Sequence, residues 1–242
     1  MAGISFPADF HNNFLIVLRL LHFLAGIIWI GLLYFFNLVS TPVAKEVDFA
    51  ARAKVYPKLM LRALWWFRWS AFVTVIAGLA YWIDLVRWDA AGAQVSSFTA
   101  IHSFFLIWTV AWGILYALLI PGKGLLNKGP VLAILVAIVV AAASCLFLRF
   151  NNHGWESNNL IAIGIGGGIG WVLMLNVWGV VWRIQKRLIA WTQANAENGT
   201  PMPEKAERMA RMAFLTSRIS AWLTIPLLLF MAVASHYPMF VR

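Results

Sequence analysis

Long apolar stretches, separated by shorter polar segments, set the pattern of this chain of 242 residues. Six stretches reach the roughly 20 apolar residues that a membrane-spanning helix needs. They lie at about residues 14–38, 62–86, 98–120, 129–149, 159–182 and 213–236. The alternating segments of about ten residues that mark a membrane β-barrel are absent. The pattern predicts an all-α fold, a polytopic membrane helical bundle of about six transmembrane helices, as a single integral membrane domain over residues 1–242.

Composition and charge agree with a membrane protein and indicate its orientation. The chain is 62% hydrophobic and 12% charged, so a soluble domain of this length could not bury its apolar surface. The connections after the first, third and fifth spans carry fourteen Lys and Arg residues, whereas the opposite side carries three, Arg87, Arg149 and Arg242. Because cytoplasmic connections hold the excess of Lys and Arg, we expect a multi-pass protein of the cell (inner) membrane with both termini extracytoplasmic. The net charge of +10 then reflects topology in membrane lipid, and no nucleic-acid partner is expected.

Several chemistries are disfavoured by what the sequence lacks. Cys145 is the single cysteine, so a C-x-x-C-H attachment of covalent c-type haem, a cysteine zinc site and an intrachain disulfide are all impossible. No Ser/His/Asp arrangement, no pair of carboxylates within a span and no phosphate loop is recognisable, which argues against hydrolysis and nucleotide chemistry. The first thirteen residues contain neither a basic region nor a cleavage site, so we expect the first span to be retained.

The segments between and within the spans allow further predictions. Residues 43–56 and 204–216 have helical spacing of small, apolar and charged residues, and we interpret them as interfacial helices or extensions of the spans. Residues 195–203 contain glycine and two prolines and are predicted to form a loop. The glycines within 164–170 include GxxxG spacing, which indicates the close approach of another helix or of the flat face of a cofactor.

Three histidines lie inside or at the ends of the predicted spans: His22, His102 and His236. All three fall at the extracytoplasmic side of the predicted topology. Ionisable side chains in spans are rare and usually face a protein interior, and imidazole is a common ligand of metal ions and haem iron. Their placement predicts a redox centre near that face, with these histidines as candidate haem iron ligands. Each could instead be an ordinary interface residue.

Arg19 and Trp29 accompany His22 in the first span. Arg19 is three residues before His22, so the two share a helical face, and Arg19 lies one turn nearer the surface, where a haem propionate would sit. Trp29 lies deeper and could pack against a planar cofactor. In the alternative interpretation, Arg19 reaches outward to the interface, His22 hydrogen-bonds a neighbouring helix and Trp29 belongs to the core. We take Arg19 and Trp29 as candidate cofactor-binding residues together with the three histidines.

Four segments of the chain resemble the urate oxidase N-terminal domain family. They are residues 22–37, 62–69, 176–186 and 217–238, the last containing Ala-Ser-His-Tyr-Pro. In that family a membrane domain is typically fused to a C-terminal cytochrome c. The resemblance implies oxidation of a small purine, with electrons passed to a cytochrome c outside the cytoplasm. Because this chain stops at Arg242 and has no C-x-x-C-H, we expect any electron acceptor to be a separate protein.

The leading hypothesis is an integral membrane redox protein that resembles the membrane domain of urate oxidase. It would hold haem b through His22 together with His236 or His102, and pass electrons to a separate cytochrome c or to a larger membrane protein complex. The alternative is a non-catalytic structural or accessory subunit of a larger respiratory or photosynthetic membrane complex. A transporter is a third hypothesis, which broken spans in matched halves would favour.

Overall fold

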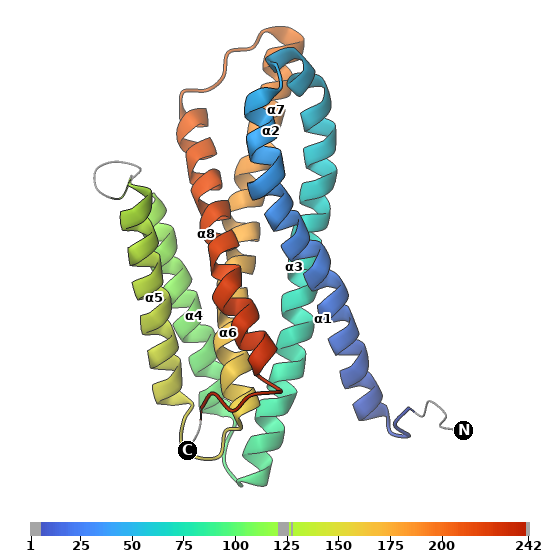
Figure 1. Ribbon diagram of the computed structural model, residues 1–242, viewed down its shortest axis with the longest axis vertical. Helices are drawn as coiled ribbons and strands as arrows, with labels where there is room; N and C mark the ends of the chain where they lie inside the picture. The colour runs from blue at the N-terminus through green and yellow to red at the C-terminus, as the bar shows by residue number, and fades with distance from the viewer. Residues whose placement is uncertain (1–5, 121–125, 127, 241–242) are drawn as a thin grey trace.

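The computed structural model describes residues 6–120, 126 and 128–240, with the side chains of all but residues 49, 50, 52 and 53. The secondary structure of this described part is helical throughout, which confirms the all-α prediction (Figure 1). In chain order the elements are α1 (Phe10–Tyr34), η1 (Phe35–Ser40), α2 (Thr41–Glu46), α3 (Phe49–Gly92), α4 (Phe98–Leu119), α5 (Gly129–Phe150), α6 (Asn158–Asn176), η3 (Val177–Val181), α7 (Trp182–Asn198) and α8 (Lys205–Val233). Lys123 and Arg242, two of the basic residues counted in the sequence, lie outside the described residues, as does the side chain of Arg52.

Six helices of the described chain are long and apolar enough to cross a membrane, in agreement with the predicted number. Four of them extend beyond the predicted spans on their polar side. The first runs from Phe10 to Glu46, α3 begins at Phe49, the fifth continues without interruption from Asn158 to Asn198, and α8 begins at Lys205. The predicted spans end where the apolar residues end. The helices continue beyond those points because Ala, Lys, Arg and Glu are strong helix formers.

The segments between the predicted spans are correspondingly helical. Residues 43–56 contribute to α2 and to the start of α3, and α8 begins at Lys205, so 204–216 is an extension of the sixth helix. The predicted loop 195–203 is shorter than expected, because α7 continues to Asn198 and ends at Gly199 with φ 65°. A glycine in the left-handed region is a common helix terminator. The sixth helix also ends earlier than predicted, at Val233, so His236 lies in a turn beyond it.

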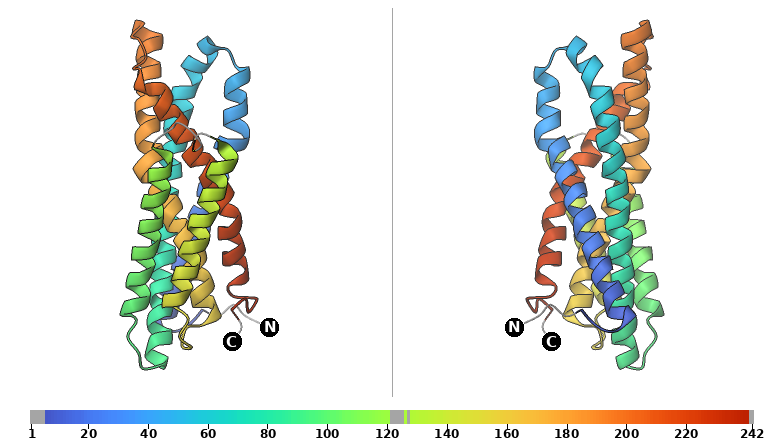
Figure 2. Two further views of the ribbon diagram at one scale, coloured as in Figure 1. Left: turned by 90° about the vertical axis from the view of Figure 1, so that its left-hand side faces the viewer. Right: turned by 90° about the vertical axis from the view of Figure 1, so that its right-hand side faces the viewer.

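The helices run up and down, and α6 lies near the centre of the bundle. In Figure 1, α1 begins and α8 ends at the lower end. The helices α3 and α7 extend beyond the upper ends of α4 and α5, as both side views show (Figure 2). The glycines of α6 let neighbouring side chains approach: a Cβ at Gly164 would collide with the Phe147 ring, and one at Gly168 with the Trp108 ring. The predicted close-packing role of the glycine run is therefore observed as side-chain contacts.

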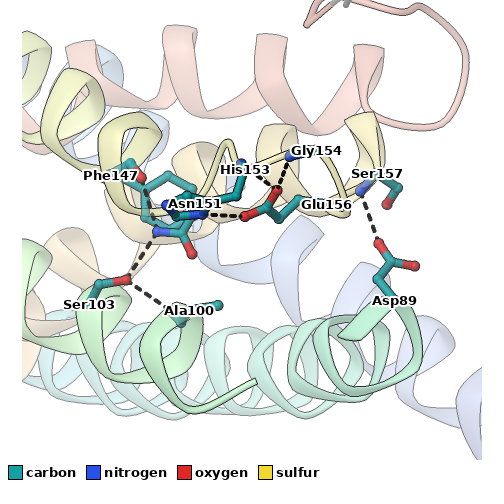
Figure 3. Close-up of polar contacts among 9 residues, drawn as sticks. All are labelled: Asp89, Ala100, Ser103, Phe147, Asn151, His153, Gly154, Glu156 and Ser157. Carbon is teal, nitrogen blue, oxygen red and sulfur yellow. Dashed lines mark hydrogen bonds and ion pairs between the residues drawn. The ribbon is translucent and has the colours of Figure 1, made fainter. Parts of the chain in front are cut away.

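A polar network holds the helices together at the lower end (Figure 3). The buried Asn151 donates from Nδ2 to the Phe147 carbonyl at 2.9 Å and to the Ser103 hydroxyl at 3.0 Å, which joins α5 to α4. The buried carboxylate of Glu156 accepts hydrogen bonds from the backbone N–H groups of His153 and Gly154, at 2.8 and 3.2 Å. This network fixes the loop between α5 and α6 and thus the starting point of α6.

Burial and hydrogen bonding act in opposite directions on the Glu156 carboxyl. Burial by itself raises its pKa, but backbone hydrogen bonds from Glu156 and His153, and the ring of His153 at 3.0 Å, outweigh burial and hold the pKa below its usual value. The hydrogen bonds of this loop therefore favour the ionised carboxylate form of Glu156.

Candidate cofactor site

A cavity of about 640 Å³ lies between α1, α3, α6 and α8 in the lower half of the bundle. Its volume is within the range of small-molecule and cofactor sites, roughly 300–1,000 Å³. The lining is mostly apolar and includes glycines from three helices. It also contains four of the five residues that the sequence predicts for the site: Arg19, His22, Trp29 and His236.

The imidazole of His22 is held by a hydrogen bond to another helix. Its Nδ1 lies 2.7 Å from the carbonyl oxygen of Thr74 on α3. A carbonyl can only accept, so Nδ1 carries the proton and Nε2 keeps its lone pair. Metal-ligating histidines are oriented in this way, with one ring nitrogen bonded to a carbonyl or carboxylate and the other left for the metal. His22 is thus prepared to be a ligand from its Nε2.

Gly78 makes room for this ring on α3. A Cβ at Gly78 would lie 2.7 Å from His22 Nδ1 and 2.8 Å from Cε1, too close for any side chain larger than hydrogen unless the ring moved. The same ring is tied to the Thr74 carbonyl one turn earlier on α3, so it has little freedom to move away. Together Thr74 and Gly78 define one position for His22 at the cavity wall.

Arg19 lies at the exposed edge of the cavity, one turn before His22. Its guanidinium is 5.8 Å from the centre of the Tyr81 ring, which also lines the cavity. Asp84 pairs with His11 and Glu156 contacts His153, and Arg19 forms no ion pair with an acidic side chain of the described residues. Arg19 can therefore bind a carboxylate that enters with a ligand.

Trp29 forms part of the inner wall and is 2% exposed. Its Nε1 is buried without a hydrogen-bond partner among the described residues. Buried indole N–H groups usually have a partner, because leaving one unpaired costs about 1–3 kcal/mol. Gly26, Gly167 and Gly170 line the same cavity. An unpaired buried donor in the wall of a cavity fits a ligand that carries acceptor atoms.

His236 reaches the cavity from the turn that follows α8. The turn is formed by backbone bonds from the His236 and Tyr237 N–H groups to the Val233 carbonyl, at 3.1 and 2.9 Å. The structure thus brings His22 and His236, separated by most of the chain, to the lining of one cavity. Sequence alone left open whether His236 or His102 accompanies His22.

His102 lies outside the cavity. Its Nδ1 bonds the carbonyl of Phe98 on its own helix at 2.8 Å, and its exposed ring stacks on Phe98 with centroids 3.7 Å apart. The expected convergence of three histidines is therefore not seen, because α4 directs His102 away from the wall formed by α1 and α3. Sequence reasoning also missed Thr74 and Gly78, since a backbone carbonyl has no sequence signal and a helical glycine has many uses.

The donor set suits a metal that arrives inside a macrocycle better than a bare metal ion. No group of three or more His, Cys, Asp or Glu side chains in the described chain could hold a metal ion by itself. A haem iron receives four ligands from its porphyrin and needs only one or two from the protein. Two histidines lining a largely apolar cavity fit that requirement.

The sequence matches one protein family over most of its length. The family described as urate oxidase N-terminal matches residues 48–242, which is most of its length. The chain belongs to this family. Three of the four segments that carry the resemblance, 62–69, 176–186 and 217–238, lie inside the match, and 22–37 precedes it. Among curated proteins and among solved structures, none matches the chain.

Proposed function

We propose that this member of the urate oxidase N-terminal family is an integral membrane redox protein that binds haem b. The observation that carries the proposal is the orientation of His22: its Nδ1–H is used by the Thr74 carbonyl, and its ring lines a cavity shared with His236. An imidazole with one nitrogen fixed and the other available is the arrangement found at metal and haem ligands.

Each lining residue has a role in this proposal. His22 and His236 would hold the haem iron, Arg19 would pair with a carboxylate of the haem at the exposed edge, and Trp29 would offer its unpaired N–H from the cavity wall. A haem held in this way can accept and release one electron. The apolar lining and glycine surfaces would exclude water and thereby help to set its potential.

The six apolar helices and the distribution of charge support a location in the membrane and its orientation. Basic residues gather on the upper parts of α3 and α7, including Lys54, Lys58, Arg183, Lys186 and Arg187. By the positive-inside rule the upper end would face the cytoplasm, and the cavity would lie toward the opposite side. Electrons would then leave on that side, toward a separate cytochrome c or a larger membrane complex.

The family's description suggests the electron donor to test first. We propose urate, or another small purine, as the reductant of the bound haem, which would make the protein an oxidoreductase when its acceptor is present. This part of the proposal depends on the family membership and not on any group seen at the cavity.

Absorption spectroscopy of protein purified from cells supplied with haem tests the proposal. We expect about one haem b per chain, a Soret band, and a sharpened α band when dithionite is added. Stopped-flow mixing with urate should then reduce the same bands if urate is the donor. Protein that remains free of haem under these conditions, while folded and monodisperse in detergent, would contradict the proposal.

A further inference from the structure

The turn that carries His236 lies beyond the last helix, so helical backbone bonds alone do not fix its histidine. Among residues 234–240, the backbone N–H groups of Ala234, His236, Tyr237 and Met239 bond backbone carbonyls, and the His236 side chain is exposed as well as lining the cavity. A ligand on such a segment needs support from elsewhere, because the supporting partners of a metal ligand set its geometry.

The side chain of Asn158, the first residue of α6, provides this support. Its Nδ2 donates to the carbonyls of Ala234 at 3.1 Å and Tyr237 at 3.0 Å, which lie on either side of His236. Its Oδ1 accepts from the N–H of Phe240 at 3.1 Å. One amide therefore makes three hydrogen bonds to a segment that follows it by 76 to 82 residues.

Asn158 is itself held in place through its neighbour. Ser157 caps α6 by accepting from the Leu160 N–H at 3.2 Å, and the Ser157 N–H donates to the Asp89 carboxylate at 3.0 Å (Figure 3). Asp89 belongs to α3, the helix whose carbonyl orients His22. The same helix thus fixes His22 directly, and fixes the start of α6 from which the His236 turn is held.

We propose that Asn158 is the positioning residue that presents His236 to the cofactor as its second axial ligand. The inference rests on the proposed haem-binding function. Asn158 does not line the cavity, so it acts only through the turn. An amide suits the task because it offers two donors and an acceptor at once, which neither a carboxylate nor an apolar side chain does.

Two variants test the positioning role. Asn158→Ala removes all three bonds. Asn158→Asp keeps an acceptor for Phe240 and a charge that is favourable at a helix N-terminus, but it loses both donors to the carbonyls beside His236. Asn158→Asp therefore tests the role even if Asn158→Ala fails to fold. The control is Asn159→Ala, since Asn159 contacts the same turn only through the Ser235 hydroxyl at 3.5 Å.

The measurement is the spin state of the ferric haem, by absorption and electron paramagnetic resonance, with haem content determined in parallel. The wild type and Asn159→Ala should be six-coordinate and low-spin. Both Asn158 variants should retain haem through His22 but show a severalfold larger five-coordinate, high-spin fraction. His236→Ala should show the same change, and added imidazole should reverse it. A haem-loaded Asn158→Asp protein with the wild-type spin state, or an equal change in Asn159→Ala, would overturn the positioning role. A wild type that binds no haem would instead overturn the proposed function, and the positioning role with it.

Discussion

His22 and His102 use the same ring nitrogen for the same kind of bond, yet they lie in different surroundings. In each, Nδ1 donates to a backbone carbonyl, at 2.7 Å from Thr74 and at 2.8 Å from Phe98. The carbonyl that accepts from His22 belongs to a residue on a neighbouring helix, α3. The half-buried His22 ring lines the cavity. The carbonyl that accepts from His102 belongs to Phe98, one turn earlier on the same helix, α4. The exposed His102 ring stacks on the Phe98 ring.

The difference shows that a suitable tautomer does not by itself make a ligand site. In both histidines a carbonyl accepts the Nδ1–H, so in the neutral form of either ring Nε2 carries the lone pair. A bond to the ring's own helix folds the ring onto that helix, whereas a bond to another helix fixes the ring between two elements. Of the two rings, only that of His22 lines the cavity.

The largest expected effect is the loss of haem when the His22 ring is removed, and removal of the His102 ring is the comparison. His22→Ala should lower the haem-to-protein ratio of purified protein by roughly tenfold or more, since even indirect supports of a metal ligand are worth 10–100-fold in affinity. His102→Ala should leave the ratio unchanged. Haem extraction with pyridine, normalised to protein concentration, measures both. Equal loss of haem in the two variants would remove the distinction between them.

The addition of a single methyl group on α3 should lower haem affinity nearly as much as the loss of the His22 ring. Gly78→Ala places a Cβ 2.7 Å from His22 Nδ1 and should displace the ring from the Thr74 carbonyl. We expect haem affinity to fall by roughly 10–100-fold, as for other losses of ligand support. The matched control is Gly113→Ala on α4, where nothing lies within 4 Å of the added Cβ.

The control should leave haem binding intact and stabilise its helix by roughly 0.5–1 kcal/mol, the usual gain of Ala over Gly in a helix. Haem titration followed by the Soret band, with thermal unfolding of each variant, separates the two results. Wild-type haem affinity in Gly78→Ala would show that the close approach of His22 to α3 is not needed.

Near His102, a substitution should change stability without changing the haem. Asn151→Ala removes the bonds from Nδ2 to Phe147 and Ser103 in a fully buried position. We expect a loss of roughly 1–3 kcal/mol, the cost of breaking buried polar contacts. Denaturant or thermal unfolding in detergent measures it, and the haem spectrum at low denaturant should match the wild type. A changed spin state would mean that the α4 side also shapes the site.

The smallest effect is the pH dependence from Glu156. Its pKa is lowered in the folded protein, so the unfolded chain binds more protons at acidic pH and stability rises with pH. The contribution is fully present above the unfolded pKa of about 4.3, and it is lost as pH falls through the folded value. Glu156→Gln should therefore lower the melting temperature near pH 6, and this effect should shrink as the pH is lowered toward 3.

Asp9→Asn is the comparison for this measurement. Hydrogen bonds from the Asn12 backbone and side chain lower the pKa of Asp9 at the start of α1, so its loss should show the same sign of pH dependence at a distant position. Thermal unfolding from about pH 3 to pH 6 follows both. A Glu156→Gln protein that is most destabilised at the acidic limit would contradict the assignment.

The helical fold could be read from the sequence because apolar length alone identifies a spanning helix. The helix ends could not, since Lys and Arg continue a helix as well as apolar residues do, as α3 and α7 show. Arg19 and His22 were predicted together because their spacing puts them on one helical face, and Trp29 was added because it lies deeper in the same span. Choosing between His102 and His236 needed the direction of α4 and the turn after α8. Nothing in the sequence indicates that Thr74 offers a carbonyl or that Asn158 holds the distant turn.

The most direct test of the haem site is an experimental density map of protein prepared with haem. The proposal predicts a flat macrocycle in the cavity between α1, α3, α6 and α8, with its iron bonded to His22 Nε2 and His236, and a propionate near Arg19. A cavity filled by lipid chains or closed by side chains, with the haem bound elsewhere or absent, would contradict it.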